Sequence, residues 1–152
     1  GTCSLLPRMI RGVATLGMGV ACLGLPALAQ DDTDDPPTLG VELNKLEQAG
    51  AACRSYMVLR NRTGATLEQL SLDLVVFDTD GVIDRRLAVE LGPAAPGRTR
   101  VKVFDMADLD CGRVARLLVN DLLTCVPDPV GDAGACDAAL RVSGRGGVDF
   151  IR

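Results

Sequence analysis

Residues 70–91 read LSLDLVVFDTDGVIDRRLAVEL, and this stretch decides the fold class. In its first half, leucine and valine alternate with serine and aspartate, which is the period of a strand with one buried face. Asp80-Gly81 then supplies the residues of a tight hairpin turn. In the second half apolar residues again oppose polar ones, with Ile83, Leu87, Val89 and Leu91 on one side. The stretch therefore predicts two antiparallel strands.

The same alternation continues on both sides of this hairpin. It is present in residues 39–43, 53–61, 101–103 and 115–119, and turn residues separate these runs. Only residues 113–123 would also fit a buried helix. About seven short strands predict an all-β sandwich over residues 39–126. The predicted core contains Leu72, Leu74, Val76, Val89, Val101, Val103 and Leu117.

Residues 9–29, MIRGVATLGMGVACLGLPALA, have the pattern of an export signal. Arg11 is followed by an apolar run and by Ala27-Leu28-Ala29, a small-x-small site, so we expect cleavage of residues 1–29 before Gln30. The apolar run is short for a membrane span. A lipoprotein signal is not expected, because Gly19 stands three residues before Cys22, where such a signal has a large aliphatic residue, and the apolar run continues past Cys22. We therefore expect a periplasmic or secreted protein with no membrane span after signal cleavage.

Two segments flank the predicted sandwich. Residues 30–38, QDDTDDPPT, are expected to form an acidic, disordered leader. They do not match a calcium site, because the turn glycine and the carbonyl ligands at fixed spacing are missing. Residues 127–152 are expected to form a disulfide-stapled loop and a flexible tail. The net charge of −4 gives no electrostatic footprint for nucleic acid, whose binders usually carry a clustered basic face, so nucleic acid is not an expected partner.

The cysteines that follow the signal are Cys53, Cys111, Cys125 and Cys136, and four exported cysteines are typical of two disulfides. Three pairings are possible. We favour Cys53–Cys111, at points where neighbouring strands can approach, with Cys125–Cys136, which flank the loop VPDPVGDAGA. A thiol oxidoreductase or a zinc site is not expected, because no cysteines are closely paired and the chain has no histidine.

The absence of histidine also argues against most acid–base and nucleophilic mechanisms. Ser55, Ser71 and Ser143 lack the sequence of a nucleophile elbow around them. Asp78 and Asp80 are the obvious carboxylate pair, but DTDG between two strands is what a hairpin turn requires. We therefore expect no catalytic residue, no metal, no cofactor and no enzyme activity.

Two segments resemble a known family. VLRNRTG at residues 58–64 and the run from Leu72 to Gly81 resemble the FxLYD-type domain, in which an Asn-x-x-Gly turn leads to a strand that ends in an aromatic-Asp-x-x-Gly turn. Pro96-Gly97 and the strand ending at Phe104 extend the resemblance to residues 39–105. It implies a small immunoglobulin- or fibronectin-like sandwich of the bacterial envelope, without catalytic residues. The chain is also similar to short exported proteins of alphaproteobacteria.

These observations favour a non-enzymatic, exported structural or protein-interaction module whose partner is an envelope protein. Such a module would present a strand edge or a loop face. The alternative is a small ligand-binding or inhibitory domain that presents the loop between Cys125 and Cys136. The two hypotheses differ in one respect, because only the second requires that loop for binding.

Overall fold

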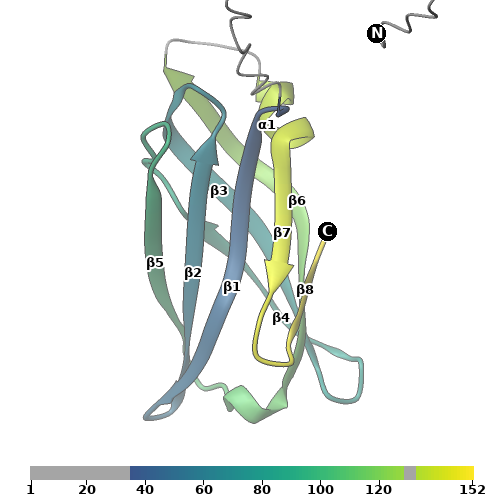
Figure 1. Ribbon diagram of the computed structural model, residues 1–152. Coiled ribbons are helices and arrows are strands. Elements are labelled where there is room, and N and C mark those ends of the chain that lie inside the picture. The colour runs from purple at the N-terminus through teal and green to yellow at the C-terminus, as the bar shows by residue number, and fades with distance from the viewer. Residues whose placement is uncertain (1–34, 129–132) are drawn as a thin grey trace, which may run out of the picture. The chain divides into compact units, whose positions relative to one another are not determined.

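The computed structural model describes residues 35–128 and 133–152, and in them the chain is an all-β sandwich of eight strands in two sheets (Figure 1). The predicted fold class is confirmed, with one strand more than expected. The export signal, its cleavage site and most of the acidic leader lie outside the described residues.

Each sheet contains four strands. Sheet A has the order β5-β2-β1-β7, and sheet B has the order β4-β3-β6-β8. In chain order the strands are β1 (Thr38–Ala49), β2 (Ala52–Arg62), β3 (Thr66–Asp78), β4 (Ile83–Glu90), β5 (Thr99–Met106), β6 (Val114–Asp128), β7 (Leu140–Gly144) and β8 (Asp149–Ile151). The short helices η1 (Cys111–Arg113) and α1 (Ala133–Ala139) lie on either side of β6. Neighbouring strands are antiparallel, except that β1–β7 and β6–β8 are parallel.

The alternation in sequence buries one face of each long strand against the opposite sheet. Five of the seven predicted core residues are buried: Leu72, Leu74, Val76, Val89 and Leu117. Sheet A contributes the buried leucines of β1 and β2 to the same cluster: Leu39, Leu43 and Leu59. Residues 114–128 form β6, so the helix that the sequence also allowed there does not occur.

Two predicted core residues, Val101 and Val103, are instead exposed, at 59% and 44%. Strand β5 pairs with β2 in a register that places Val103 opposite Tyr56, on the outer face of sheet A. Opposite residues of paired strands share a face. Phe104 is therefore on the inward-facing side with Met106, and these larger side chains pack against the core. The sequence prediction for β5 was wrong by one residue in phase.

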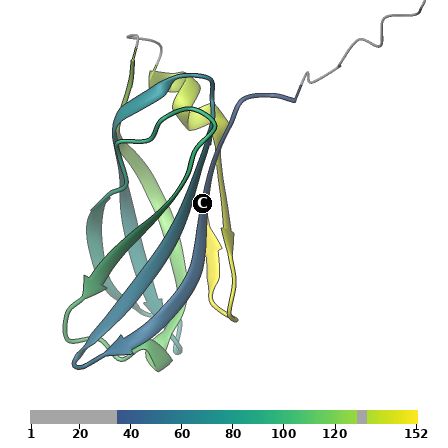
Figure 2. The ribbon, with the colours of Figure 1, turned by 60° about the vertical axis from the view of Figure 1, so that its left-hand side comes forward.

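Residues 140–144 and 149–151 form strands β7 and β8 of the sandwich, which contradicts the predicted flexible tail within residues 127–152 and the predicted domain boundary at residue 126. β7 extends sheet A beside β1, and β8 extends sheet B beside β6, as the yellow hairpin in Figure 2 shows. Leu140 and Phe150 anchor this hairpin, with 1% and 4% of their surfaces exposed. Both strands are too short to show a recognisable alternation, so the pattern does not predict them.

Two disulfides are present, and their pairing is the one favoured from the sequence. Cys53 in β2 is bonded to Cys111 in η1, and Cys125 in β6 is bonded to Cys136 in α1. The Cα atoms of the two pairs are 5.0 and 6.4 Å apart. Gln48 supports the first bridge, because its Oε1 accepts a hydrogen bond from the backbone N–H of Cys111 at 2.8 Å. Two disulfides are typical of an oxidising compartment outside the cytoplasm.

The two sides of the sandwich differ. On one side the β7–β8 hairpin passes from sheet A to sheet B and joins their margins. On the other side β5 ends sheet A and β4 ends sheet B, and no further strand of the described residues pairs with either. β7 and β8 are sheet edges as well, but they have only five and three residues, so the eight-residue strands β5 and β4 are the longer free edges at which another chain could pair.

Candidate functional site

Asp78 and Asp80, the carboxylate pair considered in the sequence, build the β3–β4 hairpin turn. Oδ1 of Asp78 accepts hydrogen bonds from the backbone N–H groups of Asp80 and Val82, both at 2.9 Å. The bond from Val82 is the main cause of the lowered pKa of Asp78. Gly81 has a φ of 78°, which glycine adopts without strain. The interpretation of DTDG as a turn is confirmed.

Two other polar side chains from the sequence analysis, those of Asn61 and Ser55, are buried in β2. Asn61 is buried, and its Nδ2 donates to the backbone oxygen atoms of Ala65 and Ala94, both at 2.8 Å. Ser55 is buried in β2, and its Oγ has no hydrogen-bond partner among the described residues. The described part of the chain holds no group of three or more residues that could bind a metal ion.

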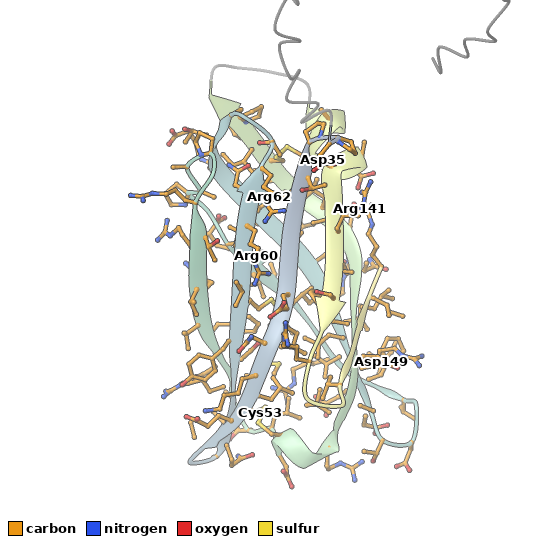
Figure 3. All side chains as sticks on the ribbon, viewed as in Figure 1. Asp35, Cys53, Arg60, Arg62, Arg141 and Asp149 are labelled. Atoms are coloured by element: carbon orange, nitrogen blue, oxygen red, sulfur yellow. A yellow bond between two sulfur atoms is a disulfide. The ribbon has the colours of Figure 1, made fainter. Side chains whose placement is uncertain are left out.

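Glu42 is a buried carboxylate on the outer face of sheet A, and three neighbouring side chains donate hydrogen bonds to it. Asn44 donates to it at 2.8 Å, Arg145 at 3.0 Å and Arg60 at 3.4 Å. The bond from Asn44 is the largest cause of the lowered pKa of Glu42, with both arginines adding to it. Figure 3 shows Arg60 on the face of β2 that is turned toward the viewer. This cluster is a satisfied structural network.

The free edge of β5 presents unpaired backbone groups. The backbone N–H of Asn61 donates to the oxygen of Arg98 at 3.2 Å, and its oxygen accepts from the N–H of Gly97 at 2.7 Å. Odd-numbered residues of β2 thus direct their backbone groups toward β5, and the pairing continues without a shift. Since these directions alternate along antiparallel strands, the N–H and C=O groups of Val101 and Val103 point away from β2.

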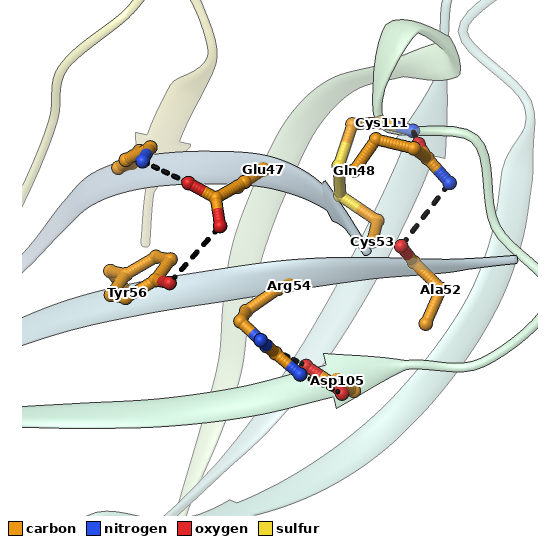
Figure 4. Close-up of polar contacts among 9 residues, drawn as sticks. Glu47, Gln48, Ala52, Cys53, Arg54, Tyr56, Asp105 and Cys111 are labelled. Carbon is orange, nitrogen blue, oxygen red and sulfur yellow. Dashed lines mark hydrogen bonds and ion pairs between the residues drawn. A yellow bond between two sulfur atoms is a disulfide. The ribbon is translucent and has the colours of Figure 1, made fainter. Parts of the chain in front are cut away.

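Exposed apolar side chains and a paired charge lie beside this edge on the outer face of sheet A. Val103 lies opposite Tyr56, and Val101, two residues earlier in β5, lies on the same face opposite Val58. Nε and Nη2 of Arg54 donate to the two carboxylate oxygen atoms of Asp105 at 2.7 and 2.9 Å (Figure 4). The hydrogen bond from Arg54 lowers the pKa of Asp105 and keeps it ionised. Tyr56 and Val103 line a depression of about 390 Å³ between them.

Cations line the opposite side of the same edge. Arg100 and Lys102 pair with buried residues of β2, so they lie on the inward-facing side, at the open rim between the sheets. Arg98 and Arg100 line an open depression of about 690 Å³ together with Glu68 from β3. Arg100 donates to the backbone oxygen of Pro93. Among the ion pairs of the described residues, none involves Arg98 or Lys102.

The second free edge, β4, is flanked by charged side chains. Asp84, Arg85, Arg86 and Glu90 make up half of this strand. Arg85 also donates to two backbone oxygen atoms of the loop between β5 and η1, and Arg86 donates to Asp73 at 2.7 Å. Charge also lies beside β5, but β5 differs in presenting two exposed valines, Val101 and Val103, at alternate positions of its outer face. We therefore regard β5 as the candidate site.

The sequence prediction missed this site because it placed Val101 and Val103 in the core. A signal is nevertheless present in residues 100–104. Arg100 and Lys102 alternate with the two valines, and Phe104 continues the phase of the cations. Charged side chains on the inward-facing side of a strand are typical of an edge strand. These cations identify the inward-facing phase of β5 only once the strand is known to lie at the edge of its sheet.

No helix among the described residues is long and apolar enough to cross a membrane. Comparisons with protein families, with curated proteins and with solved structures found no match to this chain. The geometry of the β5 edge is therefore the basis of the functional argument.

Proposed function

We propose that this chain is a non-enzymatic module, periplasmic or secreted, which binds another protein of the bacterial envelope by accepting a strand of that protein at β5. The free edge of β5 carries this proposal, because Val101 and Val103 combine outward backbone groups with exposed apolar side chains. In strand addition, main-chain hydrogen bonds supply affinity and alternate side chains supply specificity. The two disulfides support a role outside the cytoplasm.

An immunoglobulin-like fold of the FxLYD type is part of the same proposal. Two packed four-stranded sheets support it. The turns after Asn61 and Asp78 also support it, because both form at the positions that the resemblance requires. Gly64 and Gly81, which end these two turns, both have positive φ angles.

Blocking the edge tests the proposal. Val103→Pro removes a backbone N–H that points away from β2, so the β2–β5 ladder remains and only pairing with a further strand is prevented. We expect the native complex, isolated from the periplasm or the medium through a tag on this chain, to lose its partner in Val103→Pro. The matched comparison is Val103→Ala, which keeps the N–H and loses only side-chain contact, so it should weaken partner binding less than Val103→Pro does. Circular dichroism should show that both variants are folded.

A partner that remains bound to Val103→Pro would contradict strand addition at β5. If the partner instead dissociates when residues 129–132 are replaced by glycine and serine, the loop between Cys125 and Cys136 would be the binding element. That result would favour the ligand-binding or inhibitory domain.

Export has its own test. The intact mass of the protein from its native host should correspond to a mature chain that begins at Gln30. A mass that retains residues 9–29, or one that begins at a lipidated Cys22, would contradict the proposed export.

A further inference from the structure

We infer that the strand accepted by β5 alternates acidic and apolar residues, and that it comes from a different protein and not from a second copy of this chain. This inference rests on the proposed strand addition and specifies its partner. The two sides of β5 carry it, because an added strand places successive side chains alternately on the outer face and on the inward-facing side.

On the outer face, the added strand meets apolar side chains. Its residues opposite Val101 and Val103 would lie beside two exposed valines and close to Tyr56. The nearby charges, Arg54 and Asp105, are already paired with each other at 2.7 Å. Apolar and β-branched residues are therefore the favourable neighbours at these alternate positions.

On the inward-facing side, the added strand meets unbalanced positive charge. Arg98, Arg100 and Lys102 are every second residue of this segment, so all three lie on its inward-facing side. Glu68 is the one carboxylate that lines the depression with Arg98 and Arg100. Neither Arg98 nor Lys102 has an ion-pair partner among the described residues. This local excess is notable in a chain with a net charge of −4. Acidic side chains at the intervening positions would complement it.

A second copy of β5 fits this edge poorly. Antiparallel pairing about Val101 would place Arg100 opposite Lys102, and pairing about Lys102 would place the two lysines opposite each other. Like charges directly opposite one another destabilise a strand pair. Pairing about Val103 would place Val101 opposite Asp105, which is already held by Arg54. Inward-facing cations on an edge strand are a known means of preventing self-association.

Two capped peptides of eight residues, the length of β5, test the inference. One alternates valine with glutamate, and the other alternates valine with lysine. Binding is measured at low salt by the shifts of the backbone amide signals of Val101 and Val103. We expect the wild-type chain to bind the glutamate peptide at least about tenfold more tightly, because several weak charge pairs add up. High salt should reduce this difference.

Two variants of the full chain complete the experiment. The preference should reverse in the double variant Arg100→Glu, Lys102→Glu. Val103→Pro should bind neither peptide, and Val103→Ala should bind both more weakly while still preferring the glutamate peptide. The variants change exposed or rim positions of one edge strand, and their folding is checked by circular dichroism.

The outcomes separate the two proposals. If wild type binds both peptides equally and Val103→Pro binds neither, strand addition stands and the acidic preference is wrong. If neither peptide binds wild type, or if Val103→Pro binds as wild type does, strand addition at β5 is wrong as well. If sedimentation shows a dimer that Val103→Pro dissociates, a second copy occupies the edge and the inference is overturned.

Discussion

Asp73 lies on the outer face of sheet B and is nevertheless only 3% exposed, because Arg86 and Asn120 cover it. Nε of Arg86 donates to Oδ1, and Nδ2 of Asn120 donates to Oδ2, both at 2.7 Å. The bond from Arg86 is the largest cause of the lowered pKa of Asp73, and the bond from Asn120 is the second. The folded chain therefore favours the ionised form of this carboxylate.

We expect Asp73→Asn to lower the free energy of unfolding near neutral pH and to have less effect in acid. A carboxylate with a lowered pKa stabilises the fold above its unfolded pKa of about 4, and this contribution is lost as the pH falls through the folded value. Urea unfolding over a pH series measures it. A difference that does not change with pH would contradict this expectation. The control is Asp149→Asn, whose exposed carboxylate forms a surface ion pair with Arg116, an interaction that contributes about 0–1 kcal/mol.

Gly144 ends β7 at a point where there is no room for a side chain. A Cβ atom there would lie 2.5 Å from the backbone oxygen of Val148 and 3.1 Å from the backbone nitrogen of Phe150. We expect Gly144→Ala to lower the free energy of unfolding by about 1–3 kcal/mol, as overpacking does. Thermal unfolding measures this. Gly40→Ala is the matched control, because its nearest neighbour would be 3.7 Å away. Equal effects at both glycines would refute the close approach.

At the scale of single elements, the phase of each strand decides which substitutions matter. Leu74 in β3 is fully buried, whereas Val101 in β5 is 59% exposed. We expect Leu74→Ala to cost about 2–5 kcal/mol and Val101→Ala to change the free energy of unfolding by less than about 0.5 kcal/mol. Chemical denaturation of both variants measures the two values. A large loss at Val101 would place it in the core and would remove the basis of the β5 site.

The strands differ in how well the sequence predicts them, and the reason is their length and their neighbours. β3 alternates over many residues between a buried and a less buried face, so Leu72, Leu74 and Val76 are assigned correctly. β5 has apolar residues in both phases, and only its pairing with β2 determines that Phe104 points inward. β7 and β8 depend on pairing with strands distant in sequence, which periodicity does not contain.

The candidate site is also predicted only as far as local sequence determines it. The number and spacing of the cysteines predicted the disulfides, because no two cysteines have the close spacing of a redox or zinc site. The free edge of β5 depends on strand order, and strand order is a property of the whole sheet. Arg100 and Lys102 reflect this strand order in the local sequence. The inward-facing side of an edge strand lies at the open rim between the sheets, where a charged side chain can take the place of a core residue.

At the scale of the whole molecule, the two disulfides restrain the unfolded chain to different extents. Cys53 and Cys111 are separated by 58 residues in sequence, and Cys125 and Cys136 by 11. If chain entropy is the mechanism, the first bridge contributes about 4 kcal/mol and the second about 3 kcal/mol. We expect the double variant Cys53→Ala, Cys111→Ala to be the less stable of the two double-alanine variants in urea. The reverse order would show that loop length does not control their contributions.

The parallel pairing of β1 with β7 also determines the order in which the fold can be completed. Leu39 pairs with Leu140, about 100 residues later in the chain. A chain that emerges with its N-terminus first, from a ribosome or from a translocation channel, therefore has β1 in place long before its last neighbour is available. Contacts this distant form late and slowly. Until the β7–β8 hairpin arrives, β1 and β6 each have one side open to other chains. The final segment to emerge covers both of these strands, whereas the outer edge of β5 stays unpaired throughout within the described part of the chain.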